Sequence, residues 1–377
     1  MSNPWRADFP IFTHSVYLNS CSYGALSHRV EAAYGAYLES RHAKGADWIA
    51  WCEKNEIVRR QMAHLISAAP AEIAVTTSAS AALDSLVSAL APGNGRNRIV
   101  ISDFEFPTVG QIWHAQEGRG FEVVTARERD GLVPLEEFDR LIDERTLIVS
   151  IADVCYRNGT RNDVAAITRL AHERGALVLL DAYQALGAVP IDVRELGVDF
   201  LIGGVLKYLL SSAGVGLLYV RDELIPGLSP YATGWFAQAD IHAMDMHHHR
   251  EAPDARRFET GTPPIPNLFA AEAGLAQILE IGVETIAEHV RPLTARLKAG
   301  VRDLGGRLAT PEDPDRHGAM IAIRSRDDHG LVARLAARRI ITSCRDGNLR
   351  VSPHFYNSEE DIDALLAALA DNRDLLA

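Results

Sequence analysis

Short apolar runs alternate with stretches of helical periodicity along the first two thirds of the chain. The apolar runs lie at residues 99–102, 121–126, 146–151, 177–180 and 200–202. Between two of them, the stretch at 164–174 repeats apolar residues three and four positions apart, which is the spacing of one helix face. This alternation predicts an α/β fold with a mostly parallel central sheet and helices on both of its faces.

The pattern changes after residue 266. Helices are predicted near 267–281, 286–304 and 331–338, strands at 319–324, 340–343 and 349–352, and Ser358 with Asp361 forms a capping box for a last helix. We therefore predict three parts. They are an N-terminal arm at 1–25 that contributes to the small domain and the active site, a large domain at 26–262 and a smaller α+β domain at 263–377.

Two helices are predicted between the arm and the first strand of the large domain. Ser27 is placed to cap the first of them, and the second is expected at 53–68. Trp48 and Trp51 precede the second helix. An aromatic pair at this spacing suits packing against the core, and it also suits the wall of a pocket, so both interpretations stay open here.

Charge and cysteine content narrow the class of protein. The net charge of −12 provides no electrostatic attraction for nucleic acid or an anionic membrane. No apolar run approaches the roughly 20 residues of a transmembrane helix, and the first residues do not resemble a signal peptide. The four cysteines are scattered without CxxC spacing, which favours reduced thiols in a cytoplasmic protein and predicts no metal site.

A carboxylate and a lysine follow two neighbouring strands. Asp181 ends the apolar run at 177–180, and Lys207 follows the run at 200–202. The carboxyl ends of parallel strands meet at one sheet edge, where ligands bind in open α/β sheets. An amine that forms a Schiff base and a carboxylate that holds a ring nitrogen suit pyridoxal phosphate (PLP). Taken singly, Asp181 could instead cap a helix and Lys207 could be a solvated charge.

Further candidates lie at other strand ends. Small residues around Ala79 and Ser80 open a helix, where backbone N–H groups favour a phosphate, although ordinary capping by Ser78 or Ser80 explains them equally well. Phe106 lies at a strand end, where an aromatic ring could stack on a cofactor or join the core. The three histidines at 247–249 are read as a solvated loop.

Four motifs in the same order resemble one enzyme family. They are DAYQ at 181–184, KYL at 207–209, RFETGTPP at 257–264 and LRVSPHFYN at 349–357. Together they resemble the fold-type I PLP enzymes of the class V aminotransferase family, in the branch of kynureninases and cysteine desulfurases. The resemblance covers nearly the whole chain. It implies the PLP-dependent transferase (aspartate aminotransferase-like) fold.

The matched positions imply a complete cofactor site. By resemblance, Lys207 is the Schiff-base lysine, Asp181 holds the pyridine nitrogen and Gln184 bonds the phenolate oxygen of the ring. The remaining implied contacts within the chain are Phe106, stacked on the ring, and Ala79 and Ser80, at the phosphate.

A neighbouring subunit and a substrate site are implied as well. Gly261 and Thr262 match a phosphate contact supplied from the neighbouring subunit, and Trp235 matches a similar position. These matches imply a homodimer with shared active sites. Arg350 matches the arginine that binds the α-carboxylate of the amino acid, since its planar guanidinium donates two parallel hydrogen bonds. Tyr23 is expected to shape the pocket for the substrate side chain.

Departures from the family pattern bear on the reaction. Asp153 and Cys155 stand where kynureninases carry His and Asn, and Val109 replaces their acidic residue. Cys344 lies too close in sequence to Arg350 for the cysteine loop of desulfurases. The resemblance implies an enzyme that binds an α-amino acid as an external aldimine, with Lys207 as general base. We expect aminotransferase chemistry, with a carbon–sulfur or carbon–carbon lyase or an epimerase as alternatives.

Overall fold

A seven-stranded sheet lies at the centre of the larger lobe. In the computed structural model, which describes residues 3–377, the strand order is β2-β8-β7-β6-β5-β3-β4. Strands β3 to β7 run parallel, and β8 pairs antiparallel with both β7 and β2. The strands are β2 (Ile73–Thr76), β3 (Arg98–Ser102), β4 (Glu122–Ala126), β5 (Thr146–Ala152), β6 (Leu177–Asp181), β7 (Phe200–Gly204) and β8 (Gly216–Val220). The predicted mostly parallel sheet is confirmed.

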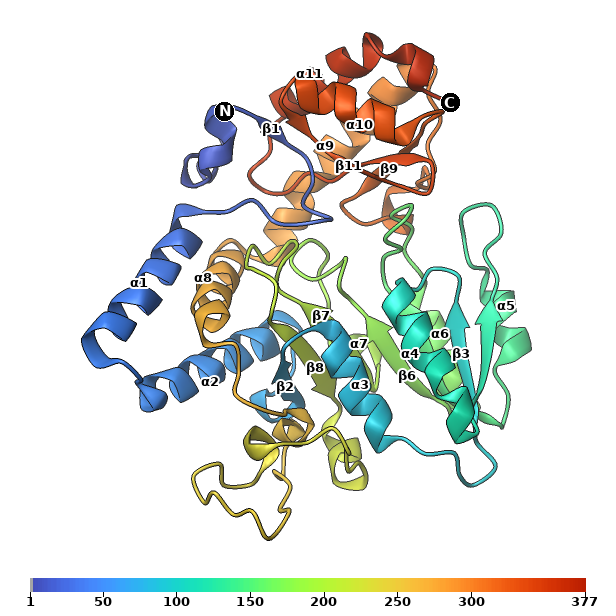
Figure 1. The fold of residues 1–377 in the computed structure, drawn as a ribbon. Coiled ribbons are helices and arrows are strands. Elements are labelled where there is room, and N and C mark those ends of the chain that lie inside the picture. Colours follow the sequence, from blue (N-terminus) through green and yellow to red (C-terminus); the bar gives the residue numbers. More distant parts are fainter. Residues whose placement is uncertain (1–2) are drawn as a thin grey trace.

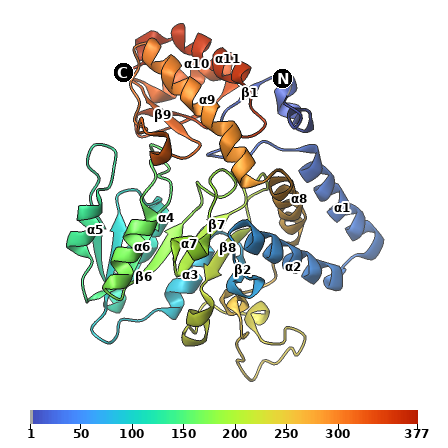
Figure 2. The ribbon, with the colours of Figure 1, turned by 180° about the vertical axis from the view of Figure 1, so that it is seen from behind.

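Helices cover both faces of this sheet (Figures 1 and 2). Successive strand residues point to opposite faces, so each strand contributes side chains to two hydrophobic cores, one on each face of the sheet. In β5, Ile148 packs in the core that includes Leu86 and Trp113, whereas Val149 packs in the core that includes Ile167. The helices between its strands are α3 (Ala79–Ala89), α4 (Pro107–Ala115), α5 (Leu135–Leu141), α6 (Val164–Glu173) and α7 (Val193–Leu196). Both cores consist of fully buried side chains, which makes the sheet a rigid support for its carboxyl edge.

The smaller lobe lies above the carboxyl edge of the sheet in Figure 1. Its three-stranded antiparallel sheet has the order β11-β12-β9. The elements are β9 (Ile321–Arg324), β10 (Ile340–Ile341), β11 (Ser343–Arg345), β12 (Asn348–Val351), α9 (Val283–Asp303), α10 (Asp328–Ala337) and α11 (Glu359–Ala370). Leu297, Ile323 and Leu365 belong to its separate core.

The N-terminal arm joins the smaller lobe. Strand β1 (Val16–Tyr17) pairs in parallel with β10, which places Val16 opposite Ile340. The backbone N–H of Ser352 donates to the carbonyl of Leu18, which extends this link. Of the arm predicted at 1–25, residues 1–2 lie outside the described part of the chain. The rest crosses from the smaller lobe to the sheet edge.

Helix α8 (Ile265–Ile281) connects the lobes. It packs against α1 (His28–Lys44) and α2 (Trp48–Leu65), which belong to the larger lobe. Gly282, with a φ of 84°, separates α8 from α9. The division into parts at residues 25 and 262 stays a prediction, and this packing favours placing the second boundary at Gly282.

Helix α2 begins earlier than its predicted start at residue 53. The carboxylate of Asp47 accepts a hydrogen bond from Ala50 N at 3.4 Å and caps the helix. Trp48 and Trp51 therefore lie in its first turn, where their rings meet edge-to-face at 5.2 Å. Trp51 is buried, which supports the packing interpretation of this pair. Among the helices described for residues 3–377, none is long and apolar enough to cross a membrane.

Candidate active site

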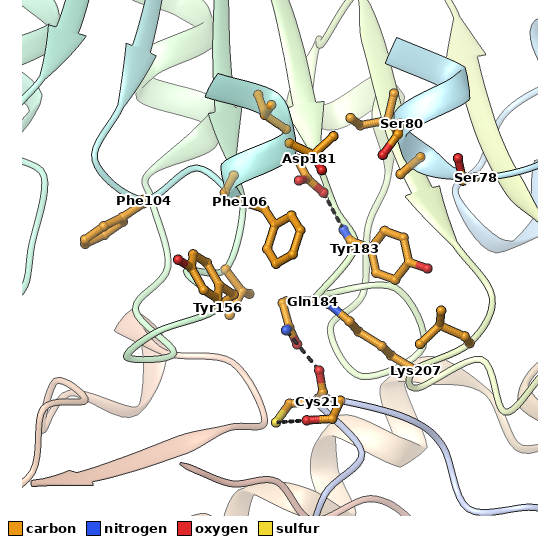
Figure 3. A pocket seen from close by; sticks show the side chains of 18 of the residues that line it. Cys21, Ser78, Ser80, Phe104, Phe106, Tyr156, Asp181, Tyr183, Gln184 and Lys207 are labelled. Atoms are coloured by element: carbon orange, nitrogen blue, oxygen red, sulfur yellow. Dashed lines mark hydrogen bonds between the residues drawn. The ribbon is translucent and has the colours of Figure 1, made fainter. Parts of the chain in front are cut away.

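A cavity of about 400 Å³ lies at the carboxyl edge of the sheet. Its walls come from three parts of the chain. Lys207 and Asp181 belong to the larger lobe, Cys21 and Ser22 belong to the arm, and Arg350 belongs to the smaller lobe. The side chains of Phe106, Asp181, Tyr183, Gln184 and Lys207 surround one space in Figure 3. Asp181, the last residue of β6, and Lys207, which follows β7, thus line the same cavity, as the order of the strands predicted.

Lys207 lies within an aromatic and largely buried setting. Its Nζ is 4.4 Å from the ring centroid of Tyr183 and 5.9 Å from that of Phe106. Burial lowers the pKa of Lys207 to about 8, although the carboxylate of Asp181 opposes this effect. At pH 7 about one tenth of this amine is therefore uncharged and able to accept a proton, far more than for an ordinary lysine.

Asp181 is fixed by its own backbone turn. Its Oδ1 accepts a hydrogen bond from Tyr183 N at 2.9 Å, which is drawn in Figure 3. Burial raises the pKa of Asp181, and the Tyr183 N–H and Lys207 oppose the change. A buried carboxylate of this kind is stabilised by a cationic ring nitrogen. This position suits the role predicted for Asp181.

Glu105 is a buried carboxyl group that the sequence analysis did not identify. Its Oε1 accepts hydrogen bonds from Ser102 Oγ at 2.8 Å and from Ala152 N at 3.0 Å. Burial, together with the charge of Asp181, raises the pKa of Glu105 to about 8. Glu105 is therefore largely protonated at neutral pH and adds little negative charge beside Asp181. Only tertiary pairing of β3 with β5 brings Glu105 to this place.

The backbone around Lys207 is held by contacts from the N-terminal arm and from the smaller lobe. Gly24 N donates to Leu206 O at 2.9 Å, and a Cβ on Gly24 would lie 2.4 Å from the carbonyl oxygen of Lys207. Only glycine permits this approach. From the smaller lobe, His354 Nε2 lies 2.8 Å from the carbonyl oxygen of Tyr208. The position of Lys207 is thus set by contacts that are remote in sequence.

The turn before α3 offers free backbone donors. Ser78 Oγ accepts from Ala81 N at 3.0 Å, which supports the capping interpretation for Ser78. The first two helical N–H groups, those of Ala79 and Ser80, have no partner within a helix. A Cβ on Gly216 would lie 2.4 Å from the carbonyl carbon of Ser78, so β8 passes close beneath this turn. Residues 78–80 line the cavity and suit a phosphate group.

The remaining walls fit an aromatic cofactor ring. Gln184 Nε2 donates one hydrogen bond to Cys21 O at 3.1 Å, and the second N–H of this amide suits a ring oxygen, which is an acceptor. Phe106 lines the cavity, and its ring meets that of Tyr156 edge-to-face at 5.1 Å. An aromatic face, an amide, a carboxylate and a lysine thus surround one space. These are the groups that bind the ring of pyridoxal phosphate in its enzymes.

Arg350 is a buried cation without a carboxylate partner in the described chain. It is 4% exposed and donates to Tyr156 O at 2.9 Å and to the hydroxyls of Ser22 and Ser343 at 3.1 Å each. Its buried Nε has no partner among the described residues. Since an unpaired buried charge is costly, this guanidinium suits an anionic ligand such as an α-carboxylate.

Four predicted residues do not line the cavity of the single chain. The Tyr23 hydroxyl lies 2.7 Å from Ser212 Oγ and faces another loop. The Trp235 ring packs against Trp48 at 5.7 Å. Gly261 and Thr262 lie on the surface. The resemblance expects Trp235, Gly261 and Thr262 to contact the site of a neighbouring subunit, so their roles and that of Tyr23 stay predictions.

Comparisons with known proteins agree with this geometry. A family model described as aminotransferase class-V matches residues 23–365. The uncharacterized aminotransferase YcbU of Bacillus subtilis (strain 168) is 36% identical over 358 residues, which cover 95% of this chain and 94% of that protein. A cysteine desulfurase of Klebsiella pneumoniae is 29% identical, with 98% of each chain covered. Kynureninases are among the further relatives.

A solved structure shows the same fold. It is that of a C-DES mutant with glycine covalently linked to the PLP cofactor. It superposes with a TM-score of 0.88 at 21% sequence identity and covers 98% of this chain and 99% of that chain. The family match spans most of the described structure, and three of the four motifs place residues in the cavity, namely Asp181, Gln184, Lys207 and Arg350. The chain belongs to the class-V aminotransferase family.

Proposed function

We propose that this chain is a PLP-dependent enzyme that removes the amino group of an α-amino acid by aminotransferase-type chemistry. Pyridoxal phosphate is the cofactor of the family, and the cavity residues fit it. When bound, it supplies an electron-accepting ring that stabilises negative charge at the substrate Cα. Lys207 and Asp181 would hold the cofactor, with Ala79 and Ser80 at its phosphate, Phe106 against its ring and Gln184 at its ring oxygen.

The residues of the chain then divide the remaining tasks. Arg350 binds the α-carboxylate and thereby orients the Cα–H bond of the substrate. The neutral amine of Lys207 accepts the proton from Cα, and its low pKa makes this transfer accessible near neutral pH. Asp181 keeps a proton on the ring nitrogen through its charge. The protonated Glu105 adds little negative charge at this end of the site.

One observation carries the choice of reaction: the cavity offers a single amine base and few further proton carriers. No histidine is among the described residues that line it. Asp153 stands where kynureninases carry His. It accepts a hydrogen bond from Arg161 Nε at 3.1 Å and is not among the described residues that line the cavity. Transamination needs one base that takes a proton and returns it nearby, and Lys207 alone can do this.

The test is a half-reaction of the holoenzyme with a panel of amino donors. We expect the bound cofactor to be converted to pyridoxamine phosphate, with one keto acid released for each cofactor converted. Both products are measured by chromatography after a single turnover. Continuous release of pyruvate, alanine or sulfide with no pyridoxamine phosphate would refute the aminotransferase assignment.

A desulfurase-type reaction is the second candidate, and one observation favours it. Such a reaction needs a protein thiol near the substrate, and Cys21 lines the cavity. Its Sγ lies 3.9 Å from Ser343 Oγ, a hydroxyl that also accepts from Arg350. Cys344, in contrast, is absent from the described cavity wall.

Cys21→Ser separates the two candidates. With cysteine as substrate, a desulfurase would release alanine and form a persulfide on the Cys21 peptide, detectable by mass spectrometry. With an added thiol as reductant, the wild type would then release sulfide and the variant would not. Under the aminotransferase proposal, wild type and variant both form pyridoxamine phosphate and neither carries a persulfide. Cys344→Ser is the matched control, since it removes a thiol outside the cavity.

The proposal includes a homodimer located in the cytoplasm. Exposed apolar side chains gather on α1 and α2, where Leu38 is 56%, Trp48 42% and Ile49 86% exposed in the single chain. Apolar groups that cluster on a surface mark an interface. Trp235 packs against Trp48 at the same region, which supports a contact from its neighbourhood to a second subunit. All four cysteines are unpaired, which supports a reducing compartment.

A further inference from the structure

Three metal-ligating side chains converge on the smaller lobe. Asp328 and His329 form the first turn of α10, and Cys344 lies at the centre of β11. One ligand atom from each lies within 4.8 Å of the other two. The three residues are 15 or 16 positions apart across the two elements, so no CxxC-type spacing marks them in the sequence. The cluster is outside the cavity that holds Lys207.

The distances suit a zinc ion. His329 Nδ1 and Cys344 Sγ lie 3.5 Å apart. Two ligands bound to one tetrahedral zinc at about 2.1 Å (nitrogen) and 2.3 Å (sulfur) are separated by about 3.6 Å. A carboxylate oxygen of Asp328 lies within 4.8 Å of both atoms, so small side-chain rotations bring the three ligands to the roughly 3.5 Å spacing of a tetrahedral site. Asp328 and Cys344 are partly exposed and His329 is exposed, so this movement is open to them.

The chemistry of the three ligands is also selective. A thiolate and an imidazole favour zinc over magnesium and calcium, which prefer oxygen ligands. We propose that Asp328, His329 and Cys344 bind one zinc ion, with water in the fourth position. Three protein ligands and an open position are the arrangement found in zinc sites that exchange a ligand.

The position of this zinc site links it to the active site. Side chains alternate along β11, so Cys344 faces α10 while Ser343 and Arg345 lie on the other face of the strand, where Arg345 lines the cavity. Ser343 Oγ accepts a hydrogen bond from Arg350 at 3.1 Å. A zinc ion that ties α10 to β11 would therefore hold the strand that supports Arg350.

A second histidine-rich region requires a control. His248 Nδ1 lies 2.9 Å from Asp245, and His249 Nδ1 lies 3.0 Å from Gln238 Nε2, both on an exposed loop. Such a loop could bind zinc on its own. The triple variant His247→Ala, His248→Ala, His249→Ala removes it and leaves the proposed site intact.

The experiment equilibrates the holoenzyme with zinc sulfate, removes unbound ion by gel filtration and measures zinc per chain by mass spectrometry of the element. In the background of the triple loop variant, we expect about one zinc per chain, lost in both Cys344→Ser and His329→Ala. Two separate ligand variants are used so that the test still holds if one of them fails to fold. Equal zinc content with and without Cys344 and His329 would overturn the proposal.

Thiol labelling provides a second readout. Cys52 and Cys344 are the two partly exposed cysteines, whereas Cys21 and Cys155 are buried. We expect zinc to slow the alkylation of Cys344 by at least about tenfold and to leave that of Cys52 unchanged, as measured by mass spectrometry of the peptides. An unchanged alkylation rate of Cys344 at saturating zinc would contradict the proposal.

Discussion

His354 Nε2 donates a hydrogen bond of 2.8 Å to the carbonyl oxygen of Tyr208, the residue that follows Lys207. Burial lowers the pKa of His354 to about 3, so its ring is neutral and its Nε2 carries the proton. The rings of Tyr208 and His354 also meet edge-to-face, with centroids 5.4 Å apart. The smaller lobe thus holds the loop that presents Lys207.

The burial of His354 predicts a loss of stability in acid. The unfolded chain protonates His354 near its ordinary pKa of about 6.5, whereas the folded chain resists protonation down to about pH 3. Between these values the unfolded state binds more protons, so stability falls as the pH falls. We expect His354 to contribute a loss of about 1.4 kcal/mol in the free energy of unfolding between about pH 7.5 and pH 5.5.

His354→Gln is the matched variant for this test, because its amide can donate to Tyr208 but does not titrate. Urea unfolding at both pH values should show a smaller acid loss in this variant than in the wild type. Equal losses in the two proteins would show that His354 is not held neutral. His354→Ala, which leaves the buried carbonyl of Tyr208 unpaired, should cost about 1–3 kcal/mol at neutral pH.

Glu105 should make the wild type less stable as the pH rises, and Glu105→Gln should remove this loss. Burial and Asp181 raise the pKa of Glu105 to about 8, so the folded state binds an extra proton above the unfolded value of about 4.5. Stability from this group is therefore lost as the pH rises from about 4.5 to 8, by at most about 1.4 kcal/mol per pH unit. Glutamine keeps the acceptor for Ser102 and Ala152 and has no charge.

The measurement compares the free energies of unfolding of Glu105→Gln and wild type across this range of pH. We expect the variant to become progressively more stable relative to the wild type as the pH rises toward 8. A constant difference between the two proteins would mean that Glu105 is ionised throughout, and the account of a protonated Glu105 beside Asp181 would fail.

Arg350→Lys should impair the use of the substrate. Arg350 presents a planar guanidinium to the cavity, and lysine cannot reproduce two parallel hydrogen bonds to a carboxylate. We expect kcat/KM with the preferred amino donor to fall by about 100-fold, as measured by steady-state kinetics. Arg324→Lys is the control, because Arg324 lies exposed on the neighbouring strand β9 and should leave kcat/KM within about twofold. Similar losses in both variants would argue against carboxylate binding by Arg350.

Sharing of active sites predicts complementation between two inactive chains. Lys207→Ala removes the amine base, and Thr262→Asp places a negative charge where the neighbouring subunit would hold its phosphate. Each homodimer should be inactive. A heterodimer purified through two different tags should contain one intact site and show about half of wild-type activity. A heterodimer as inactive as its parents would exclude a role for Thr262 in the site of the other subunit.

The central pair of the site was predictable from the sequence. Asp181 ends β6 and Lys207 follows the neighbouring parallel strand β7, where Asp181 pairs in register with Ile202. Buried strands are marked by their apolar runs, and their carboxyl ends must share an edge. Local order along the chain is therefore enough to bring a carboxylate and an amine into one cavity.

Other parts of the site depend on tertiary contacts that leave no local pattern. Glu105 reaches Ala152 only through strand pairing, and His354 reaches Tyr208 only after the lobes meet. Helix α2 begins at Trp48 with Asp47 as its cap, five residues before the predicted start at residue 53. Trp48 and Trp51 suit a pocket wall as well as a helix, so the sequence does not mark this first turn. The role predicted for Thr262 is a contact with the site of a second subunit, so it depends on an interface between two chains.

A single-turnover reaction of the holoenzyme with its best amino donor tests the central claim most directly. The account predicts that pyridoxamine phosphate and keto acid appear in equal amounts, and that Lys207→Ala slows both by at least about 1000-fold. Keto acid or sulfide released in excess of the bound cofactor, with no pyridoxamine phosphate, would contradict aminotransferase chemistry. An unchanged rate in Lys207→Ala would contradict the role of the lysine.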